Sequence, residues 1–508
     1  MSRPVDPGDA SQGRAHVTFR EGILATSAVV ALMALQLIAI DGFYLLSRNF
    51  WVDELYTYAI VADPSLAHAL RAIHGGMDSM PTYALLMRLL SIPFGDPSEV
   101  FLRSGSLGFI VLAMVGVYVL LRRAVAPAAA FAGALAVWAH PLVLTHAFDA
   151  RFHGPFLAAA VWFCFAIDRS QTRPNERRTG VGLALAALAL CAIHLFGVVV
   201  WAIALAASAI VFRRWRALWP ALAGPAVLPG LWWLALGPQR AAVTITTWEP
   251  EFSWSRAADT AGYVLVPEYL AAVFLLIWGV LCVRWMLTGG QAATPPAAAP
   301  PSALILLTSL SVLVPALVVL SLLIQPALTP RYAIAAIAAL APAVAWGVAR
   351  LPRWGAVVIM AALIVPSTNG LRRHANQARW QDQQTESLIA AFRQLPGDEP
   401  IVFEVSHVLD VMWRYAPDLR SRLVLLDFEV DDVPQPSPMR IVSRDLARAY
   451  GRFFEGPRLV TWDEVRSSSS FYLVPDPRAY AVRPGAQNRY AGYTITPVGP
   501  HVAIARRD

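Results

Sequence analysis

The sequence contains no lysine and little charge of any kind. Only 15% of its 508 residues are charged, whereas soluble globular proteins carry about 25%. All basic side chains are therefore arginines, and they gather at the ends of long apolar runs. The net charge of +7 would suit a nucleic-acid partner, but arginines in that arrangement set membrane topology, so we expect no nucleic-acid binding.

Cysteine is also scarce. The three residues, Cys164, Cys191 and Cys282, all lie inside apolar runs. An odd number of cysteines in such positions excludes a disulfide framework. We expect them to be small buried side chains.

What the sequence does have is a succession of apolar runs between about residues 22 and 370. A helix that spans a bilayer needs about 20 apolar residues. The run from 179 to 212 is too long for one helix, and we place a tight turn at His194. We therefore predict about eleven spans, at 22–46, 100–121, 126–146, 152–168, 180–195, 196–212, 217–236, 263–287, 302–324, 331–350 and 354–370.

Arginine placement predicts the topology. Arginine clusters such as Arg122 with Arg123, the loop 168–178, and Arg350 with Arg353 fall on alternate connections. These connections and the N-terminal tail, residues 1–21, are expected in the cytoplasm. Because the number of spans is odd, the C-terminal tail is then expected on the opposite, extracytoplasmic side.

The domain organisation follows from composition. Residues 22–370 form the predicted transmembrane domain, with a long first outer loop at 47–100, and residues 371–508 have ordinary soluble composition. Apolar segments in this tail alternate between strand-like and helix-like patterns, which predicts a small α/β domain. The predicted fold class is an α-helical polytopic membrane protein with a small C-terminal α/β domain.

Two acids, Asp53 and Glu54, follow the first predicted span. Carboxylates at the edge of a membrane are costly and are often functional. One of them could act as a general base, or the pair could bind a divalent metal, or the segment could simply be a solvated loop start. Further along the same loop, Asp78 precedes Pro81 and is either a helix cap or a pocket residue.

Four polar residues cluster at the outer end of the third predicted span: His146, Asp149, Arg151 and His153. Arg151 can pair with Asp149 to hold two helix ends together, or it can bind an anion. The two histidines, and His194 at another outer turn, are candidate metal ligands or hydrogen-bonded structural groups.

Arg331 and Tyr332 open the tenth predicted span. An arginine at a helix start opposes the helix dipole, and a lipid-linked phosphate would stabilise it there. Interfacial anchoring is the alternative. Arg372, at the outer end of the last predicted span, departs from the positive-inside trend and suits either a phosphate or an anionic membrane surface.

Taken in order, these segments resemble the GT-C superfamily of membrane glycosyltransferases, in particular its branch of protein O-mannosyltransferases and lipid A aminoarabinose transferases. The matching segments run across about 330 residues and are Trp51–Glu54, Asp78–Leu86, Ala150–Phe152, His194–Gly197 and Pro330–Tyr332. The resemblance implies a GT-C-like transmembrane domain in a bacterial plasma (inner) membrane. It also implies transfer of a sugar from a polyprenyl-phosphate donor to an acceptor hydroxyl on a glycan, lipid or protein.

The resemblance also implies roles for single residues. Asp53 would be the general base, with Glu54 beside it. Asp149 and Arg151 would shape the donor site, and Arg331 would hold the donor phosphate, with Tyr332 and Arg372 on the same side. We further expect Asp53, Asp149 and Arg331 to surround one outward-facing cavity.

The sequence departs from this branch at Ser79–Pro81, where aminoarabinose transferases have a Lys-Pro-Pro run. The missing lysine leaves a lipid A acceptor unsupported. No clear metal-binding motif is present, so the cofactor stays unknown. A transporter or flippase of lipid-linked glycans is the alternative function, although such proteins favour charges near the membrane midplane and repeated halves. A scaffold protein that displays the tail would leave the polar first loop unexplained.

Overall fold

The computed structural model describes residues 18–77, 80–95, 97–174, 176–212, 215–238, 252–287, 302–323, 328–404, 406–427, 438–474, 493–499 and 502–507. Asp78 lies outside the described residues. The chain divides into two units. We call Met1–Leu46, Arg103–Leu228 and Glu251–Ala375 the helical unit, and Ser47–Leu102, Pro229–Pro250 and Asn376–Asp508 the mixed unit.

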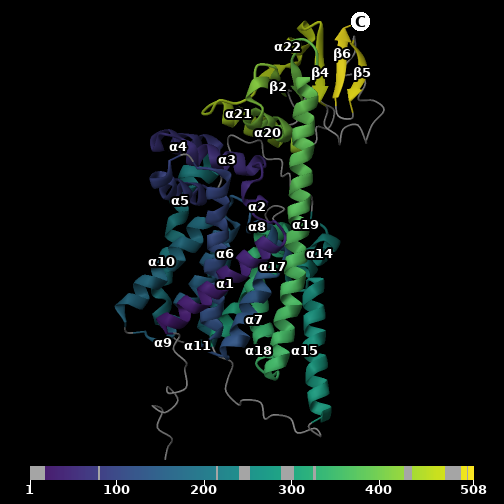
Figure 1. Cartoon of the computed structure of the whole chain (residues 1–508). Coiled ribbons are helices and arrows are strands. Elements are labelled where there is room, and N and C mark those ends of the chain that lie inside the picture. The colour runs from purple at the N-terminus through teal and green to yellow at the C-terminus, as the bar shows by residue number, and fades with distance from the viewer. Residues whose placement is uncertain are drawn as a thin grey trace, which may run out of the picture. The chain divides into compact units, whose positions relative to one another are not determined.

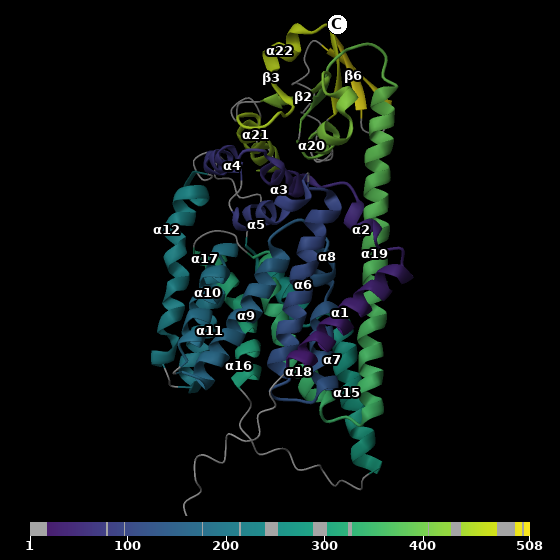
Figure 2. The ribbon, with the colours of Figure 1, turned by 60° about the vertical axis from the view of Figure 1, so that its left-hand side comes forward.

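The helical unit is a bundle (Figures 1 and 2). Within it, α7 packs against α18, and α9 packs against α10, α11, α16 and η7. The elements that fall wholly or partly in this unit are α1 (Phe19–Ala39), α2 (Tyr44–Ser47), α6 (Glu99–Leu121), α7 (Pro127–Trp138), α8 (Pro141–His146), α9 (His153–Thr172), α10 (Arg177–Ile193), α11 (Gly197–Phe212), η4 (Trp215–Val227), α12 (Leu228–Leu231), α14 (Trp254–Leu265), α15 (Glu268–Leu287), α16 (Ser302–Ser309), η6 (Leu310–Val312), α17 (Leu313–Leu323), η7 (Pro330–Ala339), α18 (Leu340–Val348) and α19 (Arg353–Arg393).

Apolar side chains cover the outside of these helices. Ile210 and Leu323 are 76% and 77% exposed, as expected of side chains that face lipid. Among the described residues, six helices are long and apolar enough to cross a membrane, and the pair α14 and α15, bent by 53°, would make seven. The chain is therefore a multi-pass membrane protein. The total of about eleven spans stays a prediction.

One predicted boundary is confirmed and one is wrong. α10 ends at Ile193 and α11 begins at Gly197, so the chain does turn at His194. By contrast, α19 runs unbroken through 41 residues, past residue 370, where we predicted the last span to end. The polar residues beyond 370 change the composition, but arginine, glutamine and alanine are strong helix formers and continue the helix.

The mixed unit contains a six-stranded sheet with the strand order β3-β2-β1-β4-β6-β5. β1 (Ile401–Phe403), β2 (Leu423–Asp427), β3 (Arg458–Thr461) and β4 (Ser470–Val474) are parallel, while β5 (Tyr493–Gly499) and β6 (Val502–Arg507) are antiparallel additions. Helices connect the parallel strands, so the predicted α/β character of the tail is confirmed. β3 was not predicted.

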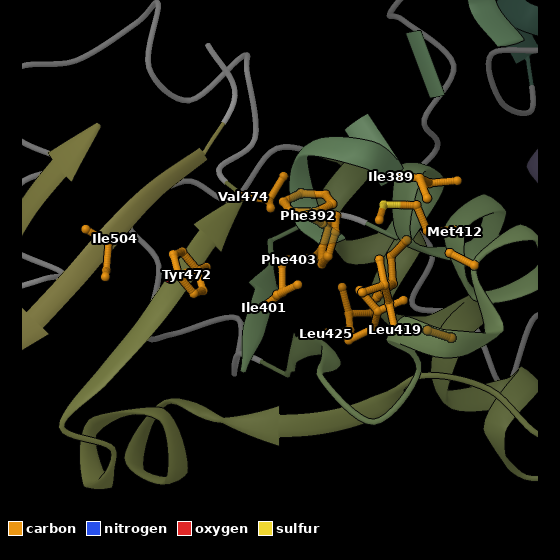
Figure 3. Packing of buried hydrophobic residues seen from close by; sticks show 14 residues of the cluster. Ile389, Phe392, Ile401, Phe403, Met412, Leu419, Leu425, Tyr472, Val474 and Ile504 are labelled. Atoms are coloured by element: carbon orange, nitrogen blue, oxygen red, sulfur yellow. The ribbon is translucent and has the colours of Figure 1, made fainter. Parts of the chain in front are cut away.

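Alternate residues of each strand point to opposite faces of the sheet. Phe403 and Tyr472 join a core with Phe392 of α19 (Figure 3). α20 (Ser406–Tyr415) and α21 (Pro438–Gly451) cover the same face. Val402 and Leu473 point to the other face, beside α22 (Trp462–Ser467). Each fully buried large apolar side chain contributes about 1.5–3 kcal/mol, and this two-sided burial stabilises the domain.

The first outer loop belongs to the mixed unit and is largely helical. It contains α3 (Val52–Ala62), α4 (Leu66–Ala72), η2 (Ile73–Met77), α5 (Thr82–Ser91) and η3 (Ile92–Phe94). The Glu99 carboxylate accepts hydrogen bonds from Arg414 and Tyr415, and the Tyr415 hydroxyl accepts one from the amide of Phe50. These bonds tie the loop to α20.

Candidate functional site

The turn between α8 and α9 holds two of the predicted site residues in direct contact. His146 is the last residue of α8, and its Nδ1 lies 2.7 Å from a carboxylate oxygen of Asp149. Asp149 is only 5% exposed. Because a buried carboxylate needs partners, the imidazole helps to hold it in place.

A chain of stacked rings continues from this turn. The ring centres of His146 and His153 are 4.1 Å apart, and His153 begins α9. Phe152 lies 4.5 Å from both His153 and His194, measured between ring centres. The His194 ring is in turn 5.5 Å from Tyr332 of η7. Residues from four elements thus meet, although up to 186 positions separate them in the sequence.

The hydrogen bonds of the two buried histidines differ. His194 Nδ1 accepts a hydrogen bond from the amide of Phe196 at 3.1 Å, so its proton is on Nε2 when the ring is neutral. His153 Nδ1 is buried and has no hydrogen-bond partner among the described residues. A buried nitrogen of this kind suggests a ligand or a water at the site.

Two arginines flank these rings. The Arg331 guanidinium lies 5.2 Å from the ring centre of Tyr332, and that of Arg151 lies 5.4 Å from Phe152. Both arginines are close enough to His153 and His194 to act on them electrostatically. The Arg151 carbonyl accepts a hydrogen bond from Ser106, which fixes the backbone of this turn against α6.

This cluster can bind two kinds of ion. The candidate ligand atoms of His146, Asp149 and His153 all lie within 4.8 Å of one another, a spacing that could hold a divalent cation. The cluster also holds two arginines, Arg151 and Arg331, beside the buried histidines, and guanidinium groups are common ligands of anions. A phosphate fits it better than a bare metal ion does.

The structure therefore brings together seven predicted residues of the helical unit: His146, Asp149, Arg151, His153, His194, Arg331 and Tyr332. Arg372 is exposed on α19, and no contact seen among the described residues brings it to this cluster. The convergence of Asp53 with these residues on one cavity stays a prediction.

Asp53 and Glu54 lie in the first turn of α3, where the helix dipole favours negative charge. Glu54 is fully buried, and its carboxylate accepts a hydrogen bond from the amide of Trp51 at 3.1 Å. Glu54 thus caps the helix that carries Asp53. Asp53 itself is half-buried, and it is near enough to Tyr56 to act on it electrostatically.

The mixed unit contains a second polar group, centred on Asp410, that was not predicted from the sequence. The hydroxyl of Tyr56 donates a hydrogen bond to Asp410 at 3.3 Å, across 354 positions of sequence. Asp410 and Arg414, four residues apart on α20, share a helix face, and that spacing is the only signal that could have suggested the group.

These features define the fold of the protein. Apolar membrane-crossing helices, a helical first outer loop and a small C-terminal α/β domain make up a GT-C-type fold. The structure is similar to two crystal structures of ArnT from Cupriavidus metallidurans, one bound to undecaprenyl phosphate and one in the apo state. ArnT is a lipid A aminoarabinose transferase, a GT-C enzyme.

The similarity extends over 95% of this chain and 98% of ArnT, with TM-scores of 0.55 and 0.58. It confirms the GT-C resemblance at the level of fold. The sequences are only 14% identical, so the similarity establishes the fold alone. No protein-family model matches the sequence, and no curated protein matches it.

Proposed function

We propose that this protein is a glycosyltransferase that moves a sugar from a polyprenyl-phosphate donor to an acceptor hydroxyl on the non-cytoplasmic side of a bacterial plasma membrane. The observation that carries the proposal is the pair of arginines, Arg151 and Arg331, beside the buried rings of His153 and His194. Guanidinium groups bind phosphate well, and a lipid-linked phosphate is an anion that a membrane protein meets.

The choice of lipid is supported by the comparison. One of the two ArnT structures holds undecaprenyl phosphate. By analogy, we propose that a polyprenyl phosphate of this type carries the donor sugar of the present protein. The acceptor, whether glycan, lipid or protein, is left open, because the lysine expected of aminoarabinose transferases is absent from Ser79–Pro81.

The proposed reaction is a single displacement. The acceptor oxygen forms a bond to the anomeric carbon of the sugar while its proton passes to the carboxylate of Asp53. The bond between that carbon and the phosphate oxygen breaks, and the electron pair leaves with the polyprenyl phosphate. The configuration at the anomeric carbon inverts. Arg331 and Arg151 stabilise the charge that grows on the phosphate, which is a strong effect where water is excluded.

The remaining residues support either the general base or the phosphate site. Glu54 holds the first turn of α3, and so orients Asp53. His146 orients Asp149, which in turn positions the donor side. Tyr332 supports Arg331 through its ring. Arg372, exposed on α19, is left as a candidate for contact with a phosphate or with the anionic membrane surface.

The direct test of the base is Asp53→Asn in the purified full-length protein, with a labelled polyprenyl-phosphate sugar as donor. Loss of a general base lowers kcat by about 10²- to 10⁴-fold, while the KM for the donor stays near its normal value. Asp259→Asn is the matched control, because Asp259 is an exposed acid of α14. Full activity of Asp53→Asn would remove Asp53 from the mechanism.

A further inference from the structure

The mixed unit contains a cavity of about 170 Å³ among α3, α20 and the residues that follow α21. Aromatic side chains line it: Tyr56, Tyr58, Trp413 and Tyr450. The rings of Tyr56 and Tyr450 are 5.8 Å apart and tilted by 55°. The indole nitrogen of Trp413 donates a hydrogen bond to the carbonyl of Glu455, which fixes that ring in place.

Polar groups meet inside these aromatic walls. Asp410 accepts a hydrogen bond from the Tyr56 hydroxyl, and Glu455, an exposed residue, contributes the backbone carbonyl that accepts the hydrogen bond from Trp413. Burial raises the pKa of Asp410 to about 7, and the hydrogen bonds from Ser406 and Tyr56 offset only part of this shift. Burial also raises the pKa of Tyr450 to about 12, and nearby Asp410 adds to the effect. Asp410 and Tyr450 therefore supply a carboxyl and a hydroxyl at the same wall.

The two arginines of the cavity are already engaged. Arg414 is paired with Glu99 at 3.0 Å and lies 3.8 Å above the ring of Tyr58. Arg420 donates to the carbonyl of Trp413 at 2.7 Å and lies over the ring of Trp413. Counted with Asp410, Glu99 and Glu455, the two arginines leave no excess of positive charge. A phosphate would find no net attraction here.

A neutral sugar ring can contact both the aromatic rings and the hydrogen-bonding groups of this cavity. Its C–H faces pack on tyrosine and tryptophan rings, while its hydroxyls donate to carboxylates and accept from phenols. The volume also fits. A water molecule occupies about 30 Å³ in the liquid, so the cavity has room for roughly five or six waters, comparable to one sugar ring.

We propose that this cavity is a carbohydrate-binding subsite that holds one neutral sugar ring of the acceptor. The proposal rests on the proposed function, because it makes the acceptor a glycan or a glycosylated molecule. The donor does not suit the cavity, since its phosphate would meet no uncommitted cation. Asp410, Trp413 and Tyr450 are then residues of acceptor specificity.

The experiment measures binding of simple sugars to the full-length protein in lipid nanodiscs by saturation-transfer NMR. The probes are the methyl glycosides of glucose, galactose, mannose and arabinose. At least one of them should receive saturation from the wild-type protein. Asp410→Asn and Tyr450→Phe should each weaken its binding about tenfold, because the first removes the carboxyl and the second the hydroxyl of the cavity wall. Asp463→Asn is the matched control, since this acid is 94% exposed on α22.

Three results would overturn the subsite: no saturation of any of the four glycosides, equal binding by the pocket variants and the wild type, or displacement of the glycoside by inorganic phosphate. Sugar transfer from the lipid donor is measured in the same nanodiscs, so the two proposals fail separately. Glycoside binding without any transfer would contradict the proposed function. Transfer without glycoside binding would contradict the subsite.

Discussion

Arg331 is the side chain on which the proposed donor site depends most. It is the second residue of η7, and it acts electrostatically on His153 and His194, which come from other elements. A guanidinium can bind phosphate through two parallel hydrogen bonds, whereas an ammonium acts as a point charge. The proposed donor site therefore requires a guanidinium at position 331, and an ammonium would not replace it fully.

We expect Arg331→Gln to lower kcat/KM for the lipid donor by about 10²-fold or more, and Arg331→Lys to restore only part of that loss. Steady-state transfer in nanodiscs gives both values. Arg177→Gln, at an exposed position near the start of α10, is the matched control. If Arg331→Gln worked as well as the wild type, the donor phosphate would have to bind elsewhere.

Asp410 is a second single residue with a testable effect, because its ionisation makes the stability of the folded protein depend on pH. Its pKa is about 7 in the folded protein and about 4 when unfolded. The folded state thus retains a proton that the unfolded state loses, and Asp410 costs stability increasingly as the pH rises from about 4 to about 7. Above pH 7 this cost is constant.

Asp410→Asn should therefore raise the midpoint of thermal unfolding relative to the wild type, by little at pH 5 and by most at pH 8. The measurement is a melting curve of each protein at several pH values, with Asp463→Asn as the control. A difference between wild type and Asp410→Asn that does not change with pH would show that Asp410 titrates normally.

The sequence predicts site residues that occupy an unusual place along the chain. It does not predict residues that become unusual only through their three-dimensional environment. Arg331 opposes a helix dipole, and Asp149 and His153 lie at the end of an apolar run, so each stands out in the sequence. Asp410 lies on an amphipathic helix of a soluble domain, where an acid is ordinary. Its burial depends on Tyr56, which no local pattern could connect to it.

Among the elements, the turn between α10 and α11 is the one that places His194. The two helices approach so closely that a Cβ on Gly197 would overlap the carbonyl oxygen of Leu190. Since that oxygen belongs to the backbone of α10, it has little freedom to move away. Glycine at this position is a requirement of packing.

Gly197→Ala should lower the stability of the protein by about 1–3 kcal/mol, as is typical of an overpacked core, and should reduce transfer by displacing His194. Gly182→Ala on α10 is the matched control, because no atom lies within 4 Å of its added Cβ. Thermal unfolding in detergent compares the two. Equal melting of both variants would contradict the close packing at this turn.

Length predicted this turn, because an apolar run from 179 to 212 exceeds one span. Composition failed at α19 for a related reason. The change from apolar to polar residues near 370 marks where the surroundings change, and the backbone hydrogen bonds continue through it. A span ends where the chain leaves the lipid, whereas a helix ends where its backbone hydrogen bonds stop, so the two boundaries need not coincide.

At the scale of the whole molecule, the membrane fold follows from the apolar runs, and the similarity to the two ArnT structures confirms that fold. The orientation of the chain stays a prediction from arginine placement. Residues 1–21 are expected in the cytoplasm and residues 371–508 outside it. The side on which catalysis occurs depends on that orientation.

Cysteine labelling tests the orientation. In a background without Cys164, Cys191 and Cys282, Asp463→Cys should react with a membrane-impermeant maleimide in intact spheroplasts. Arg177→Cys, in a predicted cytoplasmic loop, should react only after the membrane is opened. The opposite pattern would place the tail in the cytoplasm and exclude an external transfer reaction.

The fate of a labelled sugar on its lipid is the most direct measurement of the proposed activity. The purified protein is reconstituted into liposomes with a radiolabelled polyprenyl-phosphate sugar and an envelope extract as acceptor source. We predict that label leaves the lipid fraction, appears on the acceptor and leaves polyprenyl phosphate behind. An intact labelled donor that merely crosses the bilayer would contradict the glycosyltransferase assignment and identify a transporter.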